Sequence, residues 1–285
     1  MMGFKTIKII MKPNSIYMTI LAIFAGIGSA TAQQSADLPL WELGGFGLGV
    51  SQQAYPGSDQ QVQRGLVLPY VIYRGQYLRA DQGSAGLRAI KTQDFELDIG
   101  VAGSFGSASD DIQARRGMPK LGTLVEFGPR AKWNLGEGPG KGRWSVELPV
   151  RGVFDLSEGG QYRGIALEPE LVFSRRSPTG WAYSTSVGAI LANRQLADTY
   201  YGVATPFAVA NRPAYAAKSG LVAWRLGVSA SRSITPDWRF FSFARFDSVS
   251  GAANENSPLV KQKNGASIGI GVAYTWMRSE AKARP

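Results

Sequence analysis

The chain has 285 residues, a formal net charge of +10, and neither histidine nor cysteine. The missing histidines exclude Ser-His-Asp and Cys-His catalysis and imidazole zinc sites, and the missing cysteines exclude disulfides. The basic residues are scattered and form no basic helix or arm, so we expect no nucleic-acid partner. Because histidine and cysteine are both missing, we also expect no catalytic site, no metal site and no cofactor. The 35 glycines and 11% aromatic residues favour short turns and curved strands over a helical protein.

Residues 1–32 have the pattern of a secretory signal peptide. Three lysines (Lys5, Lys8 and Lys12) precede an apolar run at residues 16–27, and the small residues Ala30-Thr31-Ala32 follow it. The apolar run is shorter than the roughly 20 residues that a membrane-spanning helix needs. We therefore expect export, with cleavage after Ala32.

Beyond this segment, alternation of apolar and polar residues with a period of two predicts strands. The first strands are expected at residues 41–53, 64–73, 77–80, 85–90 and 95–105. In the second of them, Leu66, Leu68, Tyr70 and Ile72 share one face. Because alternate side chains of a strand point to opposite faces, each such strand has two faces of different character.

The clearest pattern is a long hairpin at residues 121–155, which turns through a Gly/Pro segment at 135–142. One face of its strands is largely apolar, comprising Val125, Phe127, Ala131, Trp133, Trp144, Val146, Leu148, Val150 and Phe154. Charged residues occupy many of the alternate positions. The hairpin therefore combines an apolar face with a charged face.

Five further strands are expected at residues 165–173, 181–191, 221–231, 238–247 and 265–276; in the last, Ile268, Ile270, Val272, Tyr274 and Trp276 share a face. The longer loops (106–120, 193–219 and 250–264) alternate with short connections, as in outer-membrane barrels with an even strand number. We predict an all-β fold, a transmembrane antiparallel up-and-down β-barrel of about twelve strands, with ten as the alternative. The barrel domain would cover residues 33–285, with a short periplasmic tail at 277–285.

The tryptophans provide a separate indication of the membrane boundary. Six of the seven fall at strand ends on the side of the short connections: Trp41, Trp133, Trp144, Trp181, Trp238 and Trp276. Indole rings favour the membrane interface, so these six are expected to form a girdle in contact with outer-membrane lipid on the periplasmic side.

If the apolar faces contact lipid, the charged residues face the lumen. This set comprises Glu126, Arg130, Lys132, Glu147, Arg151, Asp155, Glu168, Glu170, Arg225, Arg239, Arg245 and Asp247. Its mixed signs favour a network of ion pairs that fills the lumen, and a water-filled pore is the alternative. The pair in Glu168-Pro169-Glu170 is interpreted as structural, because two carboxylates on one strand do not flank a scissile bond as in glycosidases.

Several short motifs, in this order and spacing, resemble the MltA-interacting protein (MipA/OmpV) family of outer-membrane proteins. They are Tyr55-Pro56-Gly57-Ser58, Leu68-Pro69-Tyr70 with Tyr73-Arg74, Gly128-Pro129, Leu148-Pro149, Tyr201-Gly202-Val203, and Arg212-Pro213 with Tyr215. The resemblance covers essentially the whole chain after the signal peptide. One departure is that such barrels commonly end on an aromatic residue, whereas residues 277–285 follow Trp276 here.

The resemblance implies a non-catalytic outer-membrane scaffold in the envelope of a Gram-negative cell, linking a murein-degrading lytic transglycosylase to a murein synthase. Its docking surfaces would be the periplasmic turns and the basic tail with Lys282 and Arg284. The alternative is a porin-like diffusion channel or a surface adhesin, for which the lumen or the loop at 193–219 would matter. In that loop, Tyr200-Tyr201 and Arg212-Pro213 are expected to pack the loop onto the barrel mouth.

Overall fold

The computed structural model describes residues 38–74, 78–81, 84–87, 90–104 and 112–282. The expected signal peptide with its cleavage site, and Arg284, lie outside these residues. The strands are β1 (Trp41–Gln53), β2 (Gln61–Arg74), β3 (Leu78–Asp81), β4 (Ser84–Leu87), β5 (Ile90–Lys91), β6 (Phe95–Ser104), β7 (Leu124–Gly138), β8 (Gly142–Asp155), β9 (Gln161–Leu167), β10 (Glu170–Arg176), β11 (Ala182–Ala192), β12 (Gly220–Ser233), β13 (Trp238–Ser248) and β14 (Asn264–Arg278).

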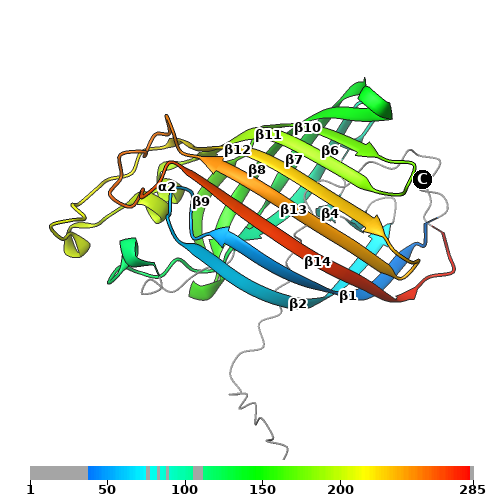
Figure 1. The fold of residues 1–285 in the computed structure, drawn as a ribbon, viewed down its shortest axis with the longest axis horizontal. Helices are drawn as coiled ribbons and strands as arrows, with labels where there is room; N and C mark the ends of the chain where they lie inside the picture. The colour runs from blue at the N-terminus through cyan, green and yellow to red at the C-terminus, as the bar shows by residue number, and fades with distance from the viewer. Residues whose placement is uncertain (1–37, 75–77, 82–83, 88–89, 105–111, 283–285) are drawn as a thin grey trace, which may run out of the picture.

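These strands form one antiparallel sheet that curls into a barrel (Figure 1). The order is β4-β3-β2-β1-β14-β13-β12-β11-β10-β8-β7-β6-β5, with β9 between β8 and β11. Contacts between β4 and β6 bring the two ends of this order together. The sequence-based prediction of an antiparallel up-and-down barrel is therefore confirmed. Where two short strands were expected at 77–80 and 85–90, the described residues form three, β3, β4 and β5.

The expected strand at residues 165–173 is divided into β9 and β10 by Glu168 and Pro169. Both pieces lie between β8 and β11, and pairing continues across the break, because the Glu168 N–H donates to Pro149 O and the Ala189 N–H donates to Pro169 O, both over 3.1 Å. Proline has no N–H to donate, which accounts for the interruption. The two pieces thus act as one crossing strand.

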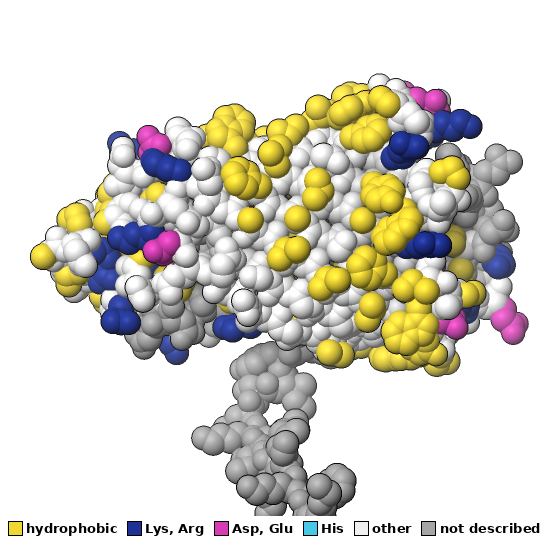
Figure 2. All heavy atoms as spheres, viewed as in Figure 1, with side chains coloured by type: hydrophobic (Ala, Val, Ile, Leu, Met, Phe, Trp, Pro, Cys, Tyr) yellow, Lys and Arg dark blue, Asp and Glu magenta, His cyan; other side chains and the backbone are white. Residues whose placement is uncertain are grey.

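The predicted faces of β7, β8 and β14 are confirmed. On β14 the exposed side chains are Ile268, Ile270, Val272, Tyr274 and Trp276, while the alternate residues face inward and are small. Figure 2 shows apolar side chains spread over this outer surface of the barrel. The inner positions must be small because neighbouring groups lie close: a Cβ on Gly271 would collide with the ring of Phe241 and with the carbonyl oxygen of Gly47.

The expectation that apolar faces point outward is wrong for β2. Leu66, Leu68 and Tyr70 face the interior, and the outward positions include Val67, which is 83% exposed, and Val71. The inward residues Leu66, Leu68 and Tyr70 pack against a cluster inside the barrel. This cluster consists of Phe46 and Leu48 from β1, Phe241 from β13 and Ala273 from β14, together with Phe243. Because this part of the barrel wall is apolar on both faces, alternation alone could not reveal which face contacts lipid.

The two ends of the barrel differ, and Figure 1 shows the contrast. We call the end with short connections the turn end; it holds the 3-10 turn η3 (Pro139–Lys141) and residues 177–180 and 234–237. The opposite end, the loop end, holds the long connections and helix α2 (Arg194–Tyr201), which the sequence did not predict. The side chain of Asn193 accepts a hydrogen bond from Leu196 N and caps this helix.

None of the described helices is long and apolar enough to cross a membrane.

At the turn end the C-terminal segment is joined to the beginning of the barrel. Strand β14 continues to Arg278, beyond the expected end at residue 276. The Leu40 N–H donates to Ala281 O over 2.7 Å, the Ser279 N–H donates to Trp41 O over 2.9 Å, and Pro39 bridges to Lys282. The described part of the tail therefore extends the β1–β14 seam.

Candidate functional site: the barrel interior and its two ends

One group of interior charges joins three neighbouring strands. The guanidinium of Arg130 on β7 binds Asp98 on β6 with two hydrogen bonds, Nε to Oδ1 over 3.1 Å and Nη2 to Oδ2 over 2.6 Å. Its Nη1 lies 3.4 Å from Glu147 on β8, and Lys132 Nζ lies 2.9 Å from the other oxygen of Glu147. Asp98 and Glu147 are buried. Two cations and two carboxylates thus neutralise one another.

A second group lies further along the same wall toward the loop end. Arg151 on β8 pairs with Glu168 over 3.0 Å and with Glu126 over 3.6 Å. Its Nε is buried without a hydrogen-bond partner. Glu170 is the cross-strand neighbour of Glu147, and it hydrogen-bonds with Ser186.

The remaining predicted charges lie on β12 and β13. Arg225 forms a bidentate pair with Asp247, over 2.7 and 2.8 Å. Arg245 stands over the ring of Phe243 at 5.2 Å, and Arg239 is on the same face of β13. Most of the predicted charges are therefore brought together as short opposite-sign groups on the strands from β6 to β13, with Arg239 and Arg245 beside them on β13, while the wall of β1, β2 and β14 is largely apolar.

Sequence reasoning missed partners in these groups. Asp98, the main partner of Arg130, lies between the apolar residues Leu97 and Ile99 of the strand expected at 95–105. Alternation along that strand would therefore have placed Asp98 on the interior face. Arg74 pairs with Glu42 over 2.7 Å between β2 and β1, where the sequence indicated no ion pair. Among the described residues no group of carboxylates is arranged to hold a metal ion.

At the loop end, four connections pack together into a cap, defined here as segments 54–62, 112–121, 193–219 and 249–262. Its apolar core includes Tyr55, Ile112, Leu196, Tyr201 and Leu259, and it continues onto the inner faces of β7, β8, β11 and β12 through Leu124, Val153, Ile190 and Val222. The expectation that Tyr200 and Tyr201 pack the loop onto the barrel agrees with this arrangement.

Hydrogen bonds from buried tyrosines connect the cap segments. The hydroxyl of Tyr55 donates to Leu259 O over 2.7 Å, and the hydroxyl of Tyr201 donates to Pro56 O over 2.9 Å. Burial raises the pKa of Tyr55 to about 12, and burial also raises the pKa of Tyr201. Both hydroxyls therefore remain protonated donors at neutral pH.

Two arginines bind backbone carbonyls inside the cap. Arg212 donates to the carbonyls of Ala114, Arg116 and Phe207, over 2.7 to 3.3 Å. Arg115 donates to the carbonyls of Thr199 and Tyr200, and burial lowers its pKa to about 10. These bonds tie the 112–121 segment to the 193–219 segment.

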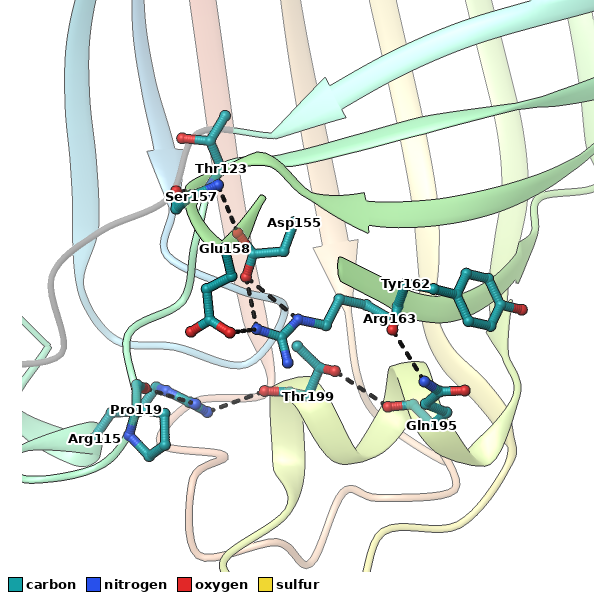
Figure 3. A network of polar contacts seen from close by, with 10 residues as sticks. All are labelled: Arg115, Pro119, Thr123, Asp155, Ser157, Glu158, Tyr162, Arg163, Gln195 and Thr199. Carbon is teal, nitrogen blue, oxygen red and sulfur yellow. Dashed lines mark hydrogen bonds and ion pairs between the residues drawn. The ribbon is translucent and has the colours of Figure 1, made fainter. Parts of the chain in front are cut away.

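Figure 3 shows how the cap meets the strand ends. Arg163 on β9 pairs with Asp155 at the end of β8 over 2.8 Å and with Glu158 over 3.0 Å. Gln195 on α2 donates to Tyr162 O over 3.0 Å. Helix α2 is thus fastened to the barrel wall on one side and to Arg115 on the other.

At the turn end, aromatic side chains pair around much of the outer surface. The pairs are Phe95–Trp133, Trp144–Phe173, Trp181–Tyr183, Trp181–Phe240 and Trp238–Tyr274, with ring centroids 4.7 to 6.0 Å apart. All six tryptophans named from the sequence lie at this end, and Trp224 lies toward the loop end of β12.

A closed antiparallel barrel with an apolar outer surface and an aromatic band at one end is a transmembrane β-barrel of the outer-membrane class. The family model for MltA-interacting protein MipA matches residues 44–276, and the chain belongs to that family. Family and fold point to the outer membrane.

Comparison with solved structures finds other outer-membrane proteins at low identity. A NanC porin is 12% identical, with 82% of this chain and 98% of that chain covered and a TM-score of 0.35. A bacterial polysaccharide outer membrane secretin is 9% identical (84% and 99% covered, TM-score 0.39), and a Pseudomonas aeruginosa FadL homologue is 9% identical (90% and 97% covered, TM-score 0.33). No curated protein matches the chain.

Proposed function

We propose that this protein is a non-catalytic outer-membrane scaffold that binds a lytic transglycosylase and a murein synthase at its turn end, which faces the periplasm. The observation that carries the proposal is the cap: apolar packing and tyrosine and arginine hydrogen bonds occupy the mouth of the barrel at the loop end. A barrel that is closed at one mouth is suited to anchoring a partner and poorly suited to passing solutes.

The interior charges support the same conclusion. Arg130, Arg151 and Arg225 each pair with carboxylates of neighbouring strands, so their charge stiffens the wall. A selective pore instead presents a ring of charge of one sign to the passing solute. The six tryptophans are proposed to hold the turn end at the membrane interface, with the interior charges lining a filled lumen.

The docking partners are proposed from the family, whose name describes an interaction with MltA, a lytic transglycosylase. The turn end offers exposed groups for such contact. Ile234, in the connection from β12 to β13, is an apolar side chain that is 65% exposed. Short connections on the periplasmic side are typical of outer-membrane barrels, which supports this orientation.

The closed mouth is tested by conductance in planar bilayers. The wild-type protein is expected to give no steady single-channel steps. Leu196→Asp places a charge in the buried core of the cap and should produce conductance, because the cap can no longer pack. Arg194→Gln, on the exposed face of the same helix, is the control and should stay silent. Steady steps from the wild-type protein would refute a closed barrel.

Docking is tested by capture of a purified lytic transglycosylase and, separately, a murein synthase on the detergent-solubilised barrel. Ile234→Asp at the turn end should weaken capture at least about tenfold, as expected for loss of one apolar anchor. Val209→Asp is the matched control, because Val209 is a 52% exposed β-branched residue in the cap. Equal capture by both variants, or no capture by the wild-type protein, would contradict the scaffold role.

A second candidate, a surface adhesin, rests on a separate observation. A polar cavity of about 190 Å³ in the cap surface is lined by Asp59, Gln113, Ala114, Asn211, Arg212 and Lys261. Loss of cell-surface attachment in Lys261→Glu cells with intact transglycosylase capture would favour the adhesin over the scaffold.

A further inference from the structure

Two arginines project from the outer face of the turn end on either side of an aromatic pair. Arg175 on β10 is the cross-strand neighbour of Tyr183 on β11. Tyr183 stacks on Trp181, with centroids 6.0 Å apart and an interplanar angle of 16°. The guanidinium of Arg232 on β12 lies 5.7 Å from the Trp181 ring centre. The order across the surface is thus arginine, tyrosine, tryptophan, arginine.

The turn between β7 and β8 makes room for Arg175. Gly140 has φ +63, and a Cβ there would lie 2.6 Å from the guanidinium carbon of Arg175. The glycine therefore lets the guanidinium rest against the turn. Lys141 follows with φ +60 and adds a further exposed cation.

These cations are not neutralised by the protein. Within the described part of the chain, Arg175, Arg232 and Lys141 form no ion pair, whereas the interior arginines Arg130 and Arg151 each have carboxylate partners. Figure 2 shows basic side chains beside apolar ones at this end of the molecule. An anion can therefore bind here without displacing an internal partner.

The surface below the two arginines is apolar. Moving along β11 and β12 toward the loop end, the outward side chains include Val187, Leu226 and Val228, all about half exposed. A soluble anion would have no use for this apolar strip. A phospholipid would use both parts, with its phosphate between the arginines and an acyl chain along the strip.

We propose that the outer surface of β10, β11 and β12 at the turn end is a binding site for one anionic phospholipid. Arg175 and Arg232 are two strands apart, roughly 10 Å across the sheet, and their long side chains can meet one phosphate from both sides when the Arg175 guanidinium swings from the β7–β8 turn toward β11. Trp181 and Tyr183 form the floor beneath the headgroup. This site depends on the membrane placement of the barrel and is independent of the docking role.

The test is native mass spectrometry of the full barrel in detergent, titrated with phosphatidylglycerol or with phosphatidylcholine of the same acyl chains. Phosphatidylglycerol should bind tighter. The double variant Arg175→Gln/Arg232→Gln should weaken its binding roughly 30-fold, about fivefold per arginine. Arg116→Gln/Arg194→Gln removes the same charge from exposed cap positions and should leave binding unchanged.

Three outcomes would overturn the proposal: equal binding of the two lipids, equal loss in both double variants, or displacement of phosphatidylglycerol by millimolar inorganic phosphate. The last would identify a soluble anion as the occupant. Transglycosylase capture by the Arg175→Gln/Arg232→Gln variant should be unchanged, which separates this site from the scaffold surface.

Discussion

Replacing Arg130 by methionine should destabilise the barrel by about 3 kcal/mol, at the lower end of the cost of breaking a buried ion pair. Asp98, which is buried, would lose both hydrogen bonds from the guanidinium. Glu147 would keep Lys132 at 2.9 Å, which limits the loss to the one carboxylate left without a partner. The same reasoning gives a smaller effect, about 1 kcal/mol, for Lys132→Met, since Arg130 still reaches Glu147.

The assay is reversible urea unfolding of the protein in lipid vesicles, followed by tryptophan fluorescence, for wild type, Arg130→Met, Asp98→Val and the double variant. Removing both partners leaves no unpaired charge, so the double variant should lie within about 1 kcal/mol of wild type. If the two single effects simply add in the double variant, or if Lys132→Met costs as much as Arg130→Met, the assignment of Asp98 to Arg130 is refuted.

Three further results are expected. Ile270→Lys puts a charge on an outward side chain that is 57% exposed on β14, and it should cost about 2–4 kcal/mol of folding free energy in vesicles but nothing comparable if that face met water. Gly271→Val should destabilise by about 1–3 kcal/mol in the same urea assay, because its side chain must displace the ring of Phe241 and a neighbouring carbonyl. Because burial raises the pKa of Tyr55 to about 12 from 10.0, its stabilisation of the cap is complete below pH 10 and is lost as pH rises toward 12. In the urea assay, stability should therefore fall over this window in wild type and fall less in Tyr55→Phe, in which Tyr201 still titrates.

The strand pattern was predictable wherever one face is apolar and the other is charged. In β7 and β8 the alternation of Phe127 and Trp144 with Arg130 and Glu147 sets the inner face, because a charge on the lipid side would be costly. On β2 the rule failed, since Leu68 and Val67 are both apolar and lie on opposite faces. Only the packing of neighbouring strands determines which of them faces the interior.

Helix α2 and the cap were not predictable to the same degree. Asn193 followed by helix-forming residues is a recognisable start signal, but eight residues make a marginal helix without tertiary contacts. The bonds from Arg212 to carbonyls nearly a hundred residues away have no local signature. Long-range pairing of this kind is decided by the closed barrel, which brings distant loops to one mouth.

The seam between the first and last strands imposes an order on biogenesis. Strand β1 pairs with β14 from Glu42↔Arg278 to Ser51↔Ile268, and the segments flanking the two strands are bridged through Pro39 and Lys282. Strand β1 therefore cannot complete its hydrogen bonding until β14 is in place, and any fragment lacking β14 keeps a row of bare amides that hydrocarbon cannot solvate. Insertion into the membrane therefore requires the two strands together.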